Sequence, residues 1–113
     1  MTTVLLIDDE PNIRRMVGAL LEAEGYEVRS AADGAAGIRA AADAEPDAVL
    51  VDLMMPGVLD GMATLEQLRS AHPDVPVIMM SGRAGLTDAV RATRLGAVNF
   101  LEKPLAPEAT LLA

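Results

Sequence analysis

The sequence predicts a single α/β domain in which helices cover both faces of a parallel sheet, a three-layer, doubly wound arrangement. Five short apolar runs alternate with longer stretches of helical periodicity. This order implies parallel strands joined by right-handed crossovers. Most of the runs are apolar without interruption, as expected of parallel strands that are covered on both faces. The length of 113 residues is near the commonest size of one domain.

The predicted strands come from these five runs. Four of them predict buried strands, at Val4–Ile7, Ala48–Val51, Val75–Met80 and Ala97–Leu101. The remaining run, Tyr26–Ala31, alternates polar and apolar residues, which favours a strand with one face toward water. We therefore expect Tyr26–Ala31 at an edge of the sheet.

The first helix is predicted between Pro11 and Gly25. Proline fits the first helical position because its missing N–H is not needed there. Glycine fits the left-handed position just past a helix end. The stretch between them repeats with helical period, and its predicted buried face consists of Ile13, Met16, Val17, Leu20 and Leu21.

Aspartates mark the starts of the second and third helices. Asp33 precedes an Ala-rich helix that ends before Pro46, and Asp60 precedes the third helix. A carboxylate at such a position can accept a hydrogen bond from a free backbone N–H of the first turn. The inward side of the third helix is predicted to consist of Met62, Leu65 and Leu68. His72, the only histidine, is expected to be an exposed charge complement at the end of this helix.

The last part of the chain predicts two more helices. Thr87 or Asp88 can open the fourth, and Gly96 closes it. A last helix, opened by Pro107, has barely two turns before the chain stops. We therefore expect a truncated last helix and a chain that is the N-terminal part of a longer protein.

Composition excludes several classes of function. The net charge of −8 makes the chain a poor candidate for direct nucleic-acid binding. It contains no Cys, which excludes disulfides, zinc–thiolate sites and thiol catalysis. No apolar run approaches membrane-spanning length, and no signal peptide precedes the first strand. The expectation is a soluble cytoplasmic protein without a membrane partner.

Polar residues follow the carboxyl ends of four predicted strands. They are Asp8, Asp9, Glu10, Asp52, Ser81 and Lys103, the chain's only lysine. Open α/β sheets bind ligands at this edge. Carboxylates from two strands favour a hard cation such as Mg²⁺, and an aspartate can also be a nucleophile that forms an acyl phosphate. Composition alone favours a site lysine and a chance surface lysine equally at position 103.

In their order, four short motifs resemble those of the receiver domains of bacterial two-component response regulators. They are DDE at 8–10, DLMMPG at 52–57, MSG at 80–82 and EKP at 102–104. The resemblance covers the chain from Val4 onward and implies a flavodoxin-like strand order 2-1-3-4-5, with one receiver domain over residues 1–113. The stretch from Val77 onward is most similar to receivers attached to AAA+ transcription activators of the nitrogen-regulation type.

The resemblance implies a phosphoacceptor beside a metal ion. Asp52 would accept a phosphoryl group from a sensor histidine kinase or a small phosphodonor. Asp8, Asp9, the Asp52 carboxylate and the backbone carbonyl of Met54 would hold Mg²⁺ or Mn²⁺. Glu10 would lie outside this set, in the turn that leads into the first helix.

The resemblance also implies a switch. Lys103 and Ser81 would stabilise the phosphoryl group, and Phe100 would rotate inward behind Ser81. The changed surface would comprise the last two strands and the fourth and fifth helices. It would act on an output domain or partner protein in transcription, or form a homodimer on phosphorylation. Such a module catalyses its own phosphorylation and dephosphorylation and is not a turnover enzyme.

The sequence departs from the family pattern in the loop after Asp52. The pair Asp60-Gly61 begins eight residues after Asp52, one more than usual. Two other functions stay open. The first is a metal-dependent phosphohydrolase, which would also use an aspartate nucleophile, although Met54 stands where such enzymes usually have a second Asp. The second is a receiver-like interaction module whose site is silent. The DDE acids could also be only a wet strand end, with Asp9 capping the helix.

Overall fold

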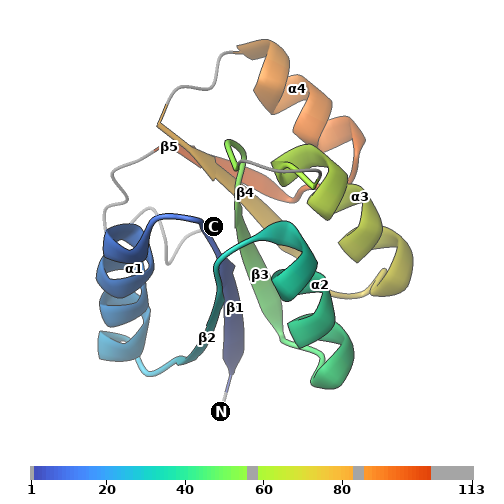
Figure 1. The fold of residues 1–113 in the computed structure, drawn as a ribbon. Coiled ribbons are helices and arrows are strands. Elements are labelled where there is room, and N and C mark those ends of the chain that lie inside the picture. Colours follow the sequence, from blue (N-terminus) through green and yellow to red (C-terminus); the bar gives the residue numbers. More distant parts are fainter. Residues whose placement is uncertain (1, 56–58, 83–85, 103–113) are drawn as a thin grey trace.

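The computed structural model describes residues 2–55, 59–82 and 86–102 and confirms the predicted α/β class (Figure 1). Strands and helices alternate along these residues. In chain order they are β1 Thr3–Ile7, α1 Pro11–Ala23, β2 Glu27–Ala31, α2 Gly34–Asp43, β3 Ala48–Asp52, α3 Gly61–Ala71, β4 Val77–Ser81, α4 Leu86–Arg94 and β5 Asn99–Glu102. The predicted last helix falls on residues outside the described ranges.

The five strands form one parallel sheet in the order β2-β1-β3-β4-β5. This is the order that the resemblance implied. The strand with alternating polarity, β2, lies at an edge as predicted. Figure 1 shows α1 on one face of the sheet, and α2, α3 and α4 on the other. The first strand, β1, lies between β2 and β3, so the chain reverses direction across the sheet beside β1 and β3.

Two hydrophobic cores explain the uninterrupted apolar strands. Leu5 and Ile7 of β1 belong to the core beneath α2, α3 and α4, whereas Val4 and Leu6 belong to the core beneath α1. Successive residues of a strand point to opposite faces, so a strand covered on both sides needs apolar residues at every position. All four are at most 5 % exposed. Burial on both faces fixes where β1 ends and therefore where its following acids emerge.

Two strands begin two residues later than predicted. The predicted Val75–Met80 begins at Val77, because Pro76 has no N–H to donate to a neighbouring strand. The predicted Ala97–Leu101 begins at Asn99. The N–H of Ala97 instead donates to the carbonyl oxygen of Ala92 at 2.9 Å and closes the end of α4.

The predicted helix caps are confirmed for α2 and α3. Asp33 Oδ1 accepts a hydrogen bond from the N–H of Ala36 at 2.7 Å, and Asp60 Oδ1 accepts one from Ala63 at 2.9 Å. The helix α4 begins at Leu86, one residue before the predicted Thr87. Both glycines predicted to end helices have positive φ angles, 93° at Gly25 and 107° at Gly96. No helix among the described residues is both long and apolar enough to span a bilayer.

Two predictions about helix surfaces are wrong. Met16 is 43 % exposed, because the buried residues of α1 are Val17, Gly18 and Leu21, and Met16 lies beside that stripe. The side chain of His72 is only 14 % exposed, and its Nδ1 lies 2.6 Å from Oε2 of Glu45. The histidine therefore has a specific partner at the end of α3.

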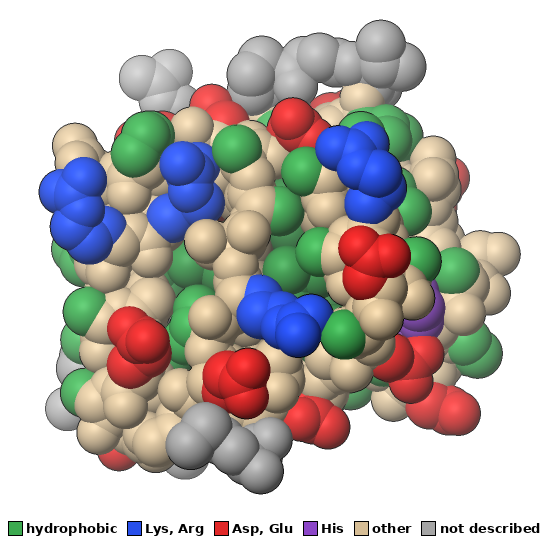
Figure 2. Space-filling view, turned by 60° about the horizontal axis from the view of Figure 1, so that its bottom comes forward, with side chains coloured by type: hydrophobic (Ala, Val, Ile, Leu, Met, Phe, Trp, Pro, Cys, Tyr) green, Lys and Arg blue, Asp and Glu red, His purple; other side chains and the backbone are tan. Residues whose placement is uncertain are grey.

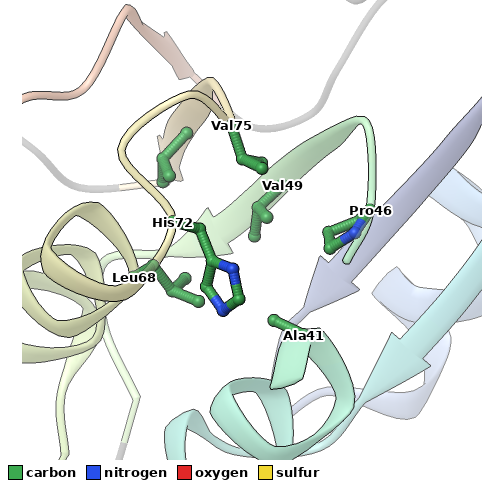
Figure 3. Close-up of a pocket in the computed structure, with 7 residues that line it drawn as sticks. Ala41, Pro46, Val49, Leu68, His72 and Val75 are labelled. Atoms are coloured by element: carbon green, nitrogen blue, oxygen red, sulfur yellow. The ribbon is translucent and has the colours of Figure 1, made fainter. Parts of the chain in front are cut away.

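His72 lies over a narrow apolar gap at the amino ends of β3 and β4 (Figure 3). The gap has no room for a water molecule, and besides His72 it is lined by Ala41, Pro46, Val49, Leu68, Val75 and Val77. On the molecular face shown in Figure 2, basic and acidic side chains are interspersed. The net negative charge is therefore not gathered there in one patch.

Candidate functional site

The register of the sheet brings two aspartates together. Ile7 of β1 pairs with Val51 of β3, so the next residues, Asp8 and Asp52, leave neighbouring strands at the same edge. Asp8 is 0 % exposed and Asp52 is 3 % exposed. Removing a carboxylate from water is costly unless partners compensate for it. Two buried carboxylates at the carboxyl edge of a parallel sheet therefore mark this edge as a candidate ligand site.

Hydrogen bonds from three directions hold Asp8. Its N–H donates to the carbonyl oxygen of Ala31 in β2 at 3.1 Å. Its Oδ1 accepts from the N–H of Glu10 at 2.9 Å, and its carbonyl oxygen accepts from Nη1 of Arg14 at 2.7 Å. The turn between β1 and α1 is thus tied to the sheet on one side and to the helix on the other.

Asp9 differs from Asp8 in the same turn. Its Oδ1 is buried and has no hydrogen-bond partner among the described residues. One carboxylate oxygen from each of Asp8, Asp9 and Glu10 can be chosen so that all three lie within 4.8 Å of one another. A buried polar atom without a partner requires an explanation, and carboxylate oxygens at this spacing suit a hard cation. The three acids therefore fit a hard cation such as Mg²⁺ or Mn²⁺. Asp8 and Asp9 belong to the set that the resemblance implies, whereas Glu10 was expected outside it and Asp52 is not part of this close group.

The interpretation of Asp9 as a helix cap is wrong. The N-cap residue of α1 is Glu10, and its side chain makes no capping hydrogen bond. Glu10 thus lies in the turn into the helix, as predicted. Its carboxylate also belongs to the acidic group.

The end of β3 is held against β4 on one side and the start of α3 on the other. The N–H of Leu53 donates to the carbonyl oxygen of Met80 at 2.9 Å, and the N–H of Gly61 donates to that of Leu53 at 3.2 Å. A Cβ atom on Gly61 would lie 2.4 Å from the backbone oxygen of Asp52. No role for Gly61 was predicted from the sequence, and glycine is the residue that allows such a close approach because it has no Cβ atom.

Met54 follows the end of β3 at the surface of the molecule. Its N–H lies 3.4 Å from Oδ1 of Asp52, and the residue is 65 % exposed. The first residues of the longer loop, up to Met55, are described, and the chain is described again from Leu59. The predicted role of the Met54 carbonyl stays a prediction.

Ser81 and Phe100 lie on the neighbouring strands β4 and β5. Asp52 pairs with Met80, so Ser81, which is 1 % exposed, comes one residue beyond that pair at the same edge. Phe100 pairs with Met79 and is half-buried against the core beneath α2, α3 and α4. Lys103 falls outside the described residues. Of the predicted site residues, Asp8, Asp9, Asp52 and Ser81 gather at one edge.

The fold and this edge define the chain as a doubly wound α/β domain with an acidic ligand site at its strand ends. A family model described as the response regulator receiver domain matches residues 4–113. The chain belongs to this family. The family assignment made from the motifs is therefore confirmed.

Curated relatives include regulators of transcription. The chain is 39 % identical over 102 residues to the nitrogen assimilation regulatory protein NtrX of Azorhizobium caulinodans, covering 89 % of this chain and 22 % of that protein. It is 34 % identical over 110 residues to the probable transcriptional regulatory protein TcrX of Mycobacterium tuberculosis, covering 97 % of this chain and 47 % of that protein. The chain thus spans less than half the length of either relative.

Solved structures show the same fold. The receiver domain of NtrX from Brucella abortus is 39 % identical with a TM-score of 0.91, over 96 % of this chain and 92 % of that one. The Vibrio cholerae chemotaxis protein CheY4 is 32 % identical with a TM-score of 0.91, over 99 % of this chain and 94 % of that one. Similarity to NtrX in both comparisons agrees with the predicted resemblance to receivers of the nitrogen-regulation type.

Proposed function

We propose that this domain is a phosphorylation switch in which Asp52 accepts a phosphoryl group from a sensor histidine kinase or a small phosphodonor. The observation that carries the proposal is the pair of buried carboxylates, Asp8 and Asp52, at the carboxyl ends of adjacent strands. Membership of the receiver family supports the same function.

The transfer would form an acyl phosphate. A carboxylate oxygen of Asp52 attacks the phosphorus, and a new O–P bond forms. The bond from phosphorus to the donor's nitrogen or oxygen breaks, and the donor keeps the electron pair. The backbone of β3 holds the carboxylate in place through its neighbours β1 and β4, which is a positioning contribution to the rate.

Asp8, Asp9, Asp52 and the backbone carbonyl of Met54 would hold Mg²⁺ or Mn²⁺. The cation, when bound, neutralises negative charge on the phosphoryl oxygens and the carboxylates. The buried Oδ1 of Asp9, without a hydrogen-bond partner among the described residues, supports this assignment. Carboxylates that lie close together at one edge of the sheet repel one another. A bound cation would reduce this repulsion, so the acidic residues also favour a site that is occupied.

Ser81 would carry the signal away from the site. Its hydroxyl, at the end of β4, would donate a hydrogen bond to the phosphoryl group, and Lys103 would bind another phosphoryl oxygen. Phe100, two residues before the end of β5, would rotate inward behind Ser81. The surface that changes would then include β4, β5, α4 and the predicted helix after them.

The output of the switch would be transcriptional. The relatives NtrX and TcrX are named as regulatory proteins, TcrX as a transcriptional one. A receiver would control an output domain, a partner protein or its own dimerisation. With a net charge of −8, the domain itself would not bind DNA. It would catalyse its own phosphorylation and dephosphorylation without turning over a substrate.

Intact-mass spectrometry tests the proposal. Incubation with Mg²⁺ and acetyl phosphate or phosphoramidate should add the mass of one phosphoryl group, and chelation of the metal before the donor is added should prevent it. The variant Asp52→Asn should stay unmodified under the same conditions. Equal uptake by Asp52→Asn and the unaltered protein would refute the assignment of the acceptor.

A further inference from the structure

We infer that Arg14 is a positioning residue for the cation site: its side chain holds the turn between β1 and α1 in the shape that presents Asp8 and Asp9 to the metal. The inference rests on the proposed function, because it assumes a cation at this corner. Its basis is the 2.7 Å hydrogen bond from Nη1 of Arg14 to the backbone oxygen of Asp8. That distance is short for an N–H···O bond, as expected when the donor is charged.

The position of Arg14 in α1 explains the contact. Helical side chains tilt toward the N-terminus of their helix, so a long side chain in the first turns can reach the residues that precede the helix. The main-chain N–H of Arg14 also donates to the carbonyl oxygen of Glu10 at 3.1 Å. Arg14 therefore bonds to the first and the last of the three consecutive acids, one through its side chain and one through its backbone.

The guanidinium binds the backbone of the turn and not the carboxylates of Asp9 and Glu10. Among the described residues, Arg14 forms no ion pair with Asp9 or Glu10. A guanidinium bound to these carboxylates would compete with a metal for the same oxygens. Contact with the carbonyl of Asp8 instead fixes the turn while Oδ1 of Asp9 keeps no hydrogen-bond partner among those residues.

Charge and positioning predict opposite effects of removing Arg14. A positive charge near the site repels a cation. If Arg14 acted only through its charge, its removal would therefore tighten Mg²⁺ binding. Loss of a residue that orients metal ligands weakens binding, typically by 10- to 100-fold. The direction of the change therefore distinguishes the two roles.

Arg15 provides a matched control. It carries the same charge one residue further along α1 and is exposed. Its Nη1 lies 3.5 Å from Oδ1 of Asn12, at the limit of a hydrogen bond, and it makes no bond to the acidic turn among the described residues. Substitution of Arg15 removes the charge without the contact to Asp8.

The test is a calorimetric Mg²⁺ titration of the unaltered protein and of Arg14→Met, Arg14→Lys and Arg15→Met, each first shown to be folded by circular dichroism. Arg14→Met should bind Mg²⁺ about tenfold more weakly. Arg15→Met should bind within about twofold of the unaltered protein, because exposed charges are screened by salt. Arg14→Lys, which keeps the charge and can still donate a hydrogen bond but lacks the planar guanidinium, should fall between Arg14→Met and the unaltered protein.

Amide hydrogen exchange in the metal-free protein distinguishes a local effect on the turn from a general effect on the stability of the fold. Arg14→Met should speed exchange at Glu10, whose N–H donates to Asp8 Oδ1, and leave exchange in β3 unchanged. Uniform acceleration across the sheet, or Mg²⁺ affinity in Arg14→Met equal to that of Arg15→Met, would overturn the inference while the proposed function stands. If the unaltered protein bound no Mg²⁺, the cation site itself would be refuted, and the inference with it.

Discussion

At the residue scale, neighbouring acids in one turn have different tasks. Asp8 is fully buried, and hydrogen bonds to Ala31, Glu10 and Arg14 fix its backbone and one carboxylate oxygen. Asp9 retains a buried oxygen with no such partner in the part of the chain that is described. The protein thus fixes one carboxylate itself, and we propose that a metal ion satisfies the free oxygen of the other. A buried polar atom in this situation is costly until a ligand satisfies it.

Gly61 gives a prediction at the same scale. Gly61→Ala should destabilise the protein by about 1–3 kcal/mol, the usual cost of overpacking. Its Cβ atom would lie 2.4 Å from the backbone oxygen of Asp52 and 2.5 Å from Cα of Leu53. Either α3 or the end of β3 must therefore move, which would also displace the proposed acceptor. Urea unfolding followed by circular dichroism measures the change in the free energy of unfolding.

Gly18→Ala is the matched control for this substitution. A Cβ atom on Gly18 would lie 3.8 Å from Cγ1 of Val28, an ordinary contact. Because glycine in a helix interior is less stable than alanine by about 0.5–1 kcal/mol, this variant should be slightly more stable than the unaltered protein. If both variants unfolded at the same urea concentration, the close approach of α3 to β3 would not exist.

At the element scale, the two ends of the sheet differ in the side chains that they bring together. Polar side chains gather at the carboxyl ends of β1, β3 and β4, whereas the amino ends of β3 and β4 border the narrow apolar gap between α2 and α3. There His72, the C-cap residue of α3, meets Glu45 from the loop after α2 (Figure 3). The pair joins two helices at the end of the molecule that is remote from the candidate site.

The His72–Glu45 pair should add only a little to stability. The Glu45 side chain is 57 % exposed, so water screens the interaction, and exposed pairs are typically worth about 0.2–1 kcal/mol. A double-mutant cycle with His72→Gln and Glu45→Gln, measured by urea unfolding, gives the coupling free energy. A coupling above about 2 kcal/mol would mean that the pair is far better shielded than its exposure indicates.

At the scale of the whole molecule, the parts that were predictable from sequence depend on repeated patterns. Apolar runs that alternate with helical stretches predicted the parallel sheet, because a strand that is buried on both faces must consist almost entirely of apolar residues. Aspartates at 33 and 60 predicted two helix starts for a local reason that the structure confirms. The same patterns placed Asp8, Asp9, Asp52 and Ser81 at one edge, since carboxyl ends of parallel strands share an edge.

Features that were not predictable depend on tertiary contacts. Arg14 and Arg15 are adjacent and chemically identical, and only the fold shows that one binds the Asp8 carbonyl while the other is exposed. The partner of His72 lies 27 residues away in sequence, beyond the reach of any local pattern.

The central claim is that Asp52, and no other carboxylate at the acidic edge, accepts the phosphoryl group. After phosphorylation with acetyl phosphate and Mg²⁺, borohydride reduces an acyl phosphate on aspartate to homoserine, which peptide mass spectrometry can locate. The account predicts homoserine at position 52 alone, and none without the donor. Homoserine at position 8 or 9, or phosphorylated protein that yields no homoserine at position 52, would contradict it.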